Sequence, residues 1–152
     1  MNKRIGIVAV IAAFLASAFV LVTVAGANHG RGGRMKATIL KGRAEVPPAD
    51  PNGLGHALIR LRPGTSEICW KLWAKRIAPA TAAHIHRGER GVNGPVVVPL
   101  SPPTTGRSQG CTTADPALIE EIRAHARDFY VNVHNDDYPG GAIRGQLHGL
   151  HR

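Results

Sequence analysis

The sequence predicts an all-β protein, an antiparallel β-sandwich of about seven strands with one short helix. Three observations predict this fold class: the apolar runs are short, turn residues separate them, and only one segment has helical periodicity. Glycine and proline interrupt the apolar runs at Pro63-Gly64, at Asn93-Gly94 and at Pro139-Gly140-Gly141. Short strands that are separated in this way are typical of β-sandwiches and β-barrels.

Seven segments have the composition of strands. In chain order they are Met35 to Leu40, His56 to Leu61, Glu67 to Ala74, Ala82 to His86, Val96 to Leu100, Phe129 to His134 and Ala142 to Leu147. In the third segment Ile68, Trp70 and Leu72 share one face, while Cys69 and Lys71 point away from it. We therefore expect a half-buried strand in which Trp70 anchors the core.

One helix is expected between the fifth and sixth strands. Asp115 is a suitable N-cap and Pro116 suits the first turn. Leu118, Ile119 and Ile122 follow at the spacing of an apolar helical stripe. The sequence therefore predicts a single amphipathic helix in an otherwise β-strand domain.

The first residues have the pattern of an export signal. Lys3 and Arg4 precede an uncharged stretch, which ends in the small-x-small form Ala25-Gly26-Ala27 of a signal peptidase site. The apolar stretch of about 20 residues is also long enough to cross a bilayer as an uncleaved anchor. Both interpretations predict a secreted or periplasmic protein. It would contact the membrane only if this segment stays uncleaved as an anchor.

The expected domain organisation follows from this pattern. Residues 1–27 are the signal peptide or N-terminal anchor, residues 28–34 are a flexible connector rich in glycine and arginine, and residues 35–152 are one domain. The formal net charge of +9 falls to +7 without Lys3 and Arg4. A basic domain attracts an anionic surface or a protein partner. Its charges are dispersed and the chain has an export signal, so nucleic acid is not expected as a partner.

The two cysteines of the chain, Cys69 and Cys111, both lie in the part expected to be exported. An even number of cysteines in an oxidising compartment predicts one disulfide. It would close a loop of about 40 residues and stabilise the fold by roughly 4 kcal/mol. Two unpaired buried thiols are the alternative, while a redox-active pair does not fit, because the spacing differs from Cys-x-x-Cys.

Three histidines are the main candidates for a functional site. His84 and His86 share one face of their strand, and Ile85 points to the opposite face. His134 likewise lies on the face of its strand that does not carry Phe129, Val131 and Val133. If the two strands are neighbours, the three imidazoles converge as they do around a transition metal.

Neutral imidazoles without a thiolate favour copper, which leads in affinity, and then zinc. The same three histidines could instead form structural hydrogen bonds. His56 is a candidate fourth ligand. The run Asn135-Asp136-Asp137 could orient an imidazole or form a polar turn. A buried Arg144 would need a partner, for which Glu45 is the candidate.

Five segments resemble the motifs of the CHRD domain, which is named after chordin and is common in bacterial secreted proteins. They are Ala44-Glu45-Val46-Pro47-Pro48, Thr81-Ala82-Ala83-His84-Ile85-His86, the run from Gly91 to Leu100, Tyr130-Val131-Asn132-Val133-His134 and the run from Pro139 to Leu147. The resemblance covers about Lys36 to Gly149 and implies a β-sandwich fold and an extracytoplasmic address. Ala142 departs from it, since an acidic residue is usual there.

These observations predict an extracytoplasmic binding module that holds copper, or else zinc, through His84, His86 and His134. A domain that binds a protein or a polyanion without a metal is the alternative. A copper enzyme of superoxide-dismutase type is the second alternative, because His-x-His on a sandwich strand is similar to two of that family's copper ligands. The rest of that ligand pattern is missing, and no catalytic triad or carboxylate pair stands out, so the sequence favours a role other than catalysis.

Overall fold

The computed structural model describes residues 34–150. The expected signal peptide or anchor (1–27) and nearly all of the connector (28–34) therefore lie outside the described residues. The strands are β1 Met35–Lys41, β2 Leu54–Arg62, β3 Glu67–Lys75, β4 Ala80–Arg87, β5 Val96–Leu100, β6 Arg107–Thr113, β7 Phe129–Asn135, β8 Ile143–Gln146 and β9 His148–Gly149. The helix α1 spans Pro116–Ala124 between β6 and β7, and three short 3-10 helices, η1 Gly42–Ala44, η2 Pro63–Thr65 and η3 Ala126–Asp128, lie in connections.

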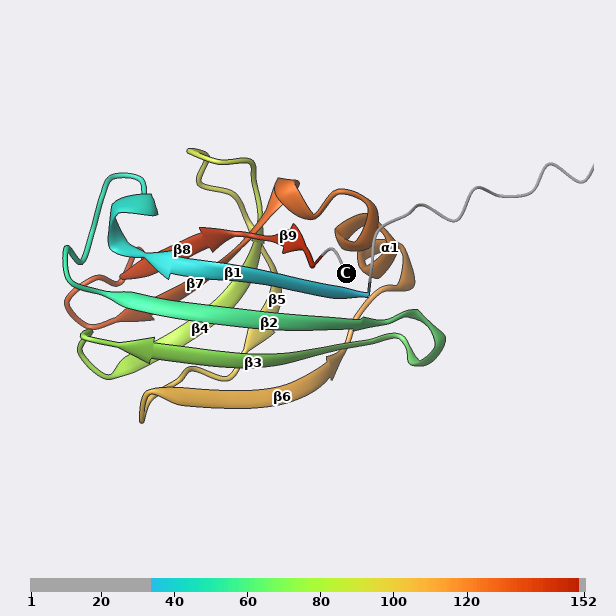
Figure 1. The fold of residues 1–152 in the computed structure, drawn as a ribbon, viewed down its shortest axis with the longest axis horizontal. Coiled ribbons are helices and arrows are strands. Elements are labelled where there is room, and N and C mark those ends of the chain that lie inside the picture. Colours follow the sequence, from blue (N-terminus) through green and yellow to red (C-terminus); the bar gives the residue numbers. More distant parts are fainter. Residues whose placement is uncertain (1–33, 151–152) are drawn as a thin grey trace, which may run out of the picture.

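The strands form one antiparallel sheet in the order β5-β4-β7-β8-β1-β2-β3-β6, and β9 also pairs with β1. The sheet curls into a nearly closed, barrel-like sandwich with two walls (Figure 1). One wall contains β1, β2, β3 and β6, and the other contains β4, β5, β7 and β8. The fold class is therefore the predicted all-β one, and the walls meet through the β8–β1 pair at Arg144 and Lys41.

The core lies between the two walls, where the apolar faces of the strands meet. Fully buried members of both walls include Leu40, Ile59, Leu72, Ile85, Val131 and Ile143. Trp70 is 6% exposed, so it is the core residue that the alternation of β3 predicts. The apolar stripe of α1 closes one end of the barrel through Ile119 and Ile122, both of which are buried.

The helix itself has the predicted start. The side chain of Asp115 accepts a hydrogen bond of 2.8 Å from the backbone N–H of Ala117, and Pro116 occupies the first turn. Within residues 34–150, no helix is long and apolar enough to span a membrane.

All seven predicted strands are present, but the sequence pattern missed β6 and the short β9. The inward residues of β6 are Ser108, Gly110 and Thr112, which give no apolar alternation. The indole ring of Trp70 fills the space over Gly110, where a Cβ would lie 2.7 Å from Cζ2 of that ring. A strand at the edge of the sheet can therefore lack apolar side chains, because its neighbour supplies the core volume.

Cys69 and Cys111 form a disulfide between directly opposed positions of β3 and β6. Cys111 lies in the edge strand β6, which the sequence pattern missed. The bond therefore ties β6, at one end of the sheet order, to the strand beside it.

Candidate metal centre

His84, His86 and His134 come together on the outer face of the wall that contains β4 and β7. These two strands are neighbours, and their register pairs His84 with Asn132 and Ala82 with His134. His134 is therefore the diagonal neighbour of His84 on the same face. One ligand nitrogen from each of the three rings lies within 4.8 Å of the other two. The convergence that strand alternation predicts is thus a feature of the fold.

Backbone carbonyls fix which nitrogen carries the proton in two of the three rings. Nδ1 of His86 lies 2.9 Å from the carbonyl oxygen of Gly94, and Nδ1 of His134 lies 3.0 Å from that of Pro139. A carbonyl oxygen only accepts, so both Nδ1 atoms must donate. In the neutral imidazoles the lone pair is then on Nε2, and Nε2 of His86 is buried without a hydrogen-bond partner in the described structure.

The third ring completes the group. Nδ1 of His84 lies 3.1 Å from Nε2 of His134, so these two nitrogens share one proton. A cation placed between them would take the place of that proton. Histidine ligands usually donate their second N–H to a backbone carbonyl or a carboxylate, as His86 and His134 do here.

Burial lowers the pKa of all three imidazoles from the usual 6.5. For His84, desolvation is the main cause, followed by the charges of His134 and His86. For His86 and His134, desolvation outweighs the carbonyl hydrogen bond, which acts in the opposite direction. The rings are therefore neutral at pH 7, and neutral imidazole is the form that binds a metal.

A loop between β4 and β5 is held over this face by side chains of β7 and β8. The guanidinium of Arg144 donates from Nη1 to Oδ1 of Asn93 at 2.8 Å, and the N–H of Gly94 donates to the hydroxyl of Tyr130 at 3.2 Å. The ring of Tyr130 stacks on that of His86 with 4.8 Å between centroids. These contacts keep the carbonyl of Gly94 in place over His86.

A second polar group adjoins the histidines on the side of β8. Asn132 is paired with His84 on one side and with Arg144 on the other. Nε of Arg144 lies 3.6 Å from Oε2 of Glu45, so the ion pair expected from the sequence is present and buried. Oε1 of Glu45, Oδ1 of Asn132 and Nη2 of Arg144 are buried without a hydrogen-bond partner among the described residues. Within residues 34–150, five buried side-chain nitrogen or oxygen atoms lack a hydrogen-bond partner. Four of them belong to Glu45, His86, Asn132 and Arg144.

Gly141 leaves room for this group. A Cβ at this position would lie 2.8 Å from Oε1 of Glu45 and 2.7 Å from Nδ2 of Asn132, and its φ of +135° disfavours any other residue. Burial raises the pKa of Glu45 to about 7, although the charge of Arg144 lowers it. Glu45 can therefore hold a proton near neutral pH.

The family model of the CHRD domain matches residues 36–147, which is most of the chain. The chain belongs to the CHRD family. No curated protein and no solved structure matches it. The segments that carry the resemblance meet at one place in this CHRD domain, since Glu45, Asn93, His134 and Arg144 all lie around the histidine face.

Several residues that the sequence singled out lie elsewhere in the CHRD domain. His56 is on β2 in the other wall, where it stacks on Trp73 with 4.3 Å between centroids, so it is no fourth ligand. The side chain of Asn135 accepts a hydrogen bond from the N–H of Tyr138, and Asp136 and Asp137 are exposed. These three residues therefore form a polar turn, the second of the two roles expected from the sequence. The groups that orient the imidazoles are backbone carbonyls, which leave no signal in a sequence.

Proposed function

We propose that this CHRD domain binds a copper ion through His84, His86 and His134. The observation that carries the proposal is the orientation of the rings. Two backbone carbonyls accept hydrogen bonds from Nδ1–H of His86 and His134, which leaves the lone pair of each ring on Nε2. One ligand nitrogen from each of the three rings lies within 4.8 Å of the other two. Copper(II) is preferred to zinc because neutral nitrogen ligands follow the Irving–Williams order. A bound copper ion would supply a Lewis acid or a redox centre.

The residues around the three ligands set the properties of the site. Asn132 and Glu45 supply polar atoms beside the histidine face, and Tyr130 covers one side of the His86 ring. His84 and His134 are half-buried, so the group is accessible from solvent on that side. We therefore propose a binding module with an accessible ion.

Isothermal titration of the purified chain with copper(II) and with zinc(II) tests the proposal. Copper should bind one ion per chain and more tightly than zinc. His86→Ala should weaken copper binding by at least about tenfold, since it removes one of three ligands. His125→Ala is the control, because His125 caps the C-terminus of α1 and should leave the affinity unchanged. Equal affinities of the two variants would refute the site.

We also propose that the chain acts outside the cytoplasm. The leader pattern of residues 1–27 and the Cys69–Cys111 disulfide support this, because disulfides persist in oxidising compartments. Fractionation of expressing cells should find the chain in the periplasm or the medium. Recovery from the cytoplasm in the reduced form would contradict the proposal.

A further inference from the structure

The outer face of β1, β2, β3 and β6 carries an excess of positive charge. The strand register places six cationic side chains on this face, which we call the basic face: Lys41, Arg60, Arg62, Lys71, Lys75 and Arg107. The one carboxylate on these four strands is Glu67, which pairs with Arg62 at 3.5 Å. Among residues 34–150 the other five cations have no ion-pair partner. Unpaired cations on one wall attract an anionic ligand.

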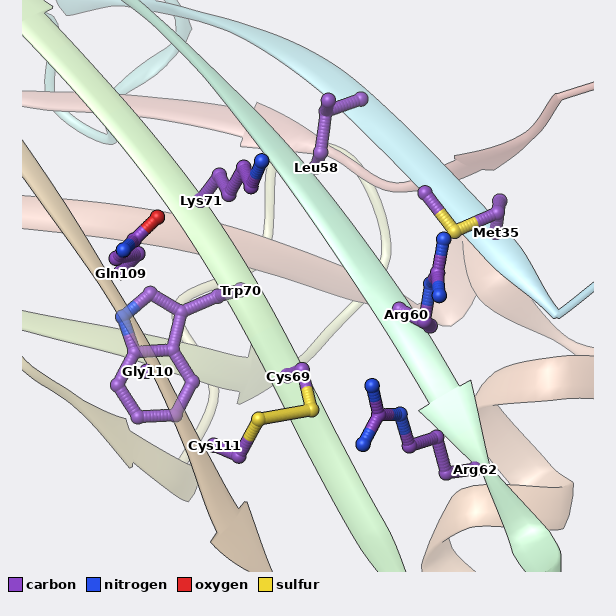
Figure 2. A pocket seen from close by; sticks show the side chains of 10 residues that line it. All are labelled: Met35, Leu58, Arg60, Arg62, Cys69, Trp70, Lys71, Gln109, Gly110 and Cys111. Atoms are coloured by element: carbon purple, nitrogen blue, oxygen red, sulfur yellow. A yellow bond between two sulfur atoms is a disulfide. The ribbon is translucent and has the colours of Figure 1, made fainter.

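Two shallow grooves lie end to end on the basic face, along β2 and β3. The first has a volume of about 580 Å³ and the second about 610 Å³. Figure 2 shows the first groove, with Arg60 and Arg62 projecting from β2 on one side of the disulfide and Lys71 lying further along β3. Lys75 and Arg107 border the second groove. The cations therefore follow a track along the strands and are not gathered at one point.

The floors of the grooves are apolar and aromatic. Met35, Leu58 and the disulfide line the first groove, and Trp73 with the stacked ring of His56 lines the second. An apolar and aromatic floor between cations suits a ligand whose rings have apolar faces and whose substituents are anionic.

We propose that the basic face binds an acidic polysaccharide, a chain of sugar rings that carry carboxylate or sulfate groups. The guanidinium and ammonium groups would pair with these anions, while the apolar faces of the sugar rings would pack on Trp73 and Leu58. The row from Leu54 to Arg62 is about 26 Å long at 3.3 Å per residue, so it offers room for several sugar rings.

The shape of the face favours a single extended chain over a lipid bilayer. Ile39 is the one exposed large apolar side chain that these four strands carry, and it is too little to insert into a membrane. A flat bilayer surface would also contact the rims of the grooves and leave Leu58 and Trp73 uncovered. A narrow chain can reach both the rims and the floors.

The test uses the purified full-length chain and two probes, polygalacturonate for carboxylates and heparin for sulfates. Calorimetry should detect binding to at least one of them, weakening steeply as salt is added, and no binding to neutral dextran. Lys71→Glu with Arg107→Glu should weaken this binding by at least about tenfold, because two attractive contacts become repulsive. Arg90→Glu with Arg127→Glu makes the same change of net charge on a different groove and should weaken it less than about threefold.

Equal losses in the two double variants would overturn the proposal, because the attraction would then depend on net charge alone. Failure to bind either polysaccharide would overturn it as well. Stronger binding to phosphatidylglycerol vesicles than to both polysaccharides, lost in the Lys71→Glu, Arg107→Glu variant, would replace it by a membrane surface. The Lys71→Glu, Arg107→Glu variant should keep the copper affinity of the parent chain, since the histidines lie on the other wall, so this result does not depend on the proposed metal site.

Discussion

At the scale of single residues, the candidate metal site depends on the buried polar atoms of His86 and Asn132. His86 is 8% exposed, its Nδ1 is held by a carbonyl and its Nε2 has no partner within residues 34–150. Asn132 lies directly between His84 and Arg144 in the strand register, with Oδ1 also buried and unpaired. Buried polar atoms are normally hydrogen-bonded, so unpaired atoms that gather on one face favour a ligand site there.

Glu45 should make stability depend on pH in a distinctive way. Its pKa rises from 4.5 in the unfolded chain to about 7 in the fold. Between these values the folded state holds a proton that the unfolded state has lost, so this residue contributes stability at low pH that disappears as the pH rises through 7. Glu45→Gln removes the effect. Relative to the parent, its free energy of unfolding should rise by about 3 kcal/mol between pH 4.5 and pH 8.

Urea unfolding at several pH values measures this difference. Glu89→Gln changes an exposed glutamate and serves as the control, for which the parent profile is expected. A constant difference between Glu45→Gln and the parent at every pH would show that the pKa of Glu45 is the same in the folded and the unfolded chain.

At the scale of elements, the strands provide the three histidines of the candidate site and the loops fix the orientation of their rings. The pairing of β4 with β5 shifts register between Ile85 and His86, and such irregularities often occur beside functional sites. Beyond this point the loop from Gly88 to Pro95 folds back over the face. Asn93 donates from Nδ2 to the carbonyl of Val46 at 2.7 Å, so this loop is also joined to the segment after η1. The polar outer face of β7 is therefore covered and largely buried.

Gly94→Ala should disturb the site without changing a ligand. A Cβ at this position would collide with the carbonyl oxygen of Arg87, so the loop must move and the acceptor for Nδ1 of His86 moves with it. We expect copper affinity to fall by at least about tenfold, as for the loss of other groups that orient metal ligands. Gly140→Ala is the matched control, because a Cβ there meets nothing within 4 Å. Titration of both variants gives the comparison, and an unchanged affinity in Gly94→Ala would contradict the role of the loop.

The edge strand β6 should depend on its disulfide. Cys69 and Cys111 are 42 residues apart in the chain, so their bond restricts a long loop in the unfolded state. Replacing both with alanine should lower the free energy of unfolding by about 4 kcal/mol. Denaturant unfolding measures this change. Thiol titration of the unfolded, unreduced protein should find no free thiol, and two free thiols would show that the bond does not form.

At the scale of the whole molecule, the curled sheet separates two surfaces. Figure 1 shows these two walls. The wall of β4, β5, β7 and β8 carries the histidines on its outer face, and the wall of β1, β2, β3 and β6 carries the basic face. The shared core fixes both walls, so a ligand on either surface stabilises the entire domain. The two proposed ligands are chemically opposite, one a cation and one a polyanion.

Copper should raise the melting temperature of the domain in a manner that depends on pH. At free copper of about one hundred times its Kd, mass action adds about 2.7 kcal/mol. The histidine pKa values are lowered in the fold, so the rings stay neutral down to below 6.5 and lose their lone pairs only when the pH falls further. Once the pH has fallen far enough to protonate these rings, copper stabilisation should disappear. The stability without copper should also fall, because the same histidines become protonated at a higher pH in the unfolded chain than in the fold. Thermal unfolding with and without copper at pH 7.5 and pH 5 measures both effects.

The sequence by itself determined the helix, seven of the nine strands in residues 34–150 and the direction of most of their side chains. Alternation placed Ile85, Val131 and Trp70 in the core and the three histidines on one outer face, and the residue types at Asp115 and Pro116 located the start of the helix. These features follow from local periodicity, which a strand or helix imposes on a few consecutive residues. Pairing of the two cysteines followed from their even number and the export pattern of the leader.

Only the tertiary structure decided which groups meet across the chain. Nε of Arg144 donates to the carbonyl of Ala44, which lies 100 residues earlier, and Gly94 and Pro139 supply the carbonyls that orient the imidazoles. The strand β6 was missed because Trp70 fills its share of the core. Any residue type presents the same backbone carbonyl, and packing between distant strands depends on both partners. Neither leaves a periodic pattern, so both become visible only when the sheet has closed.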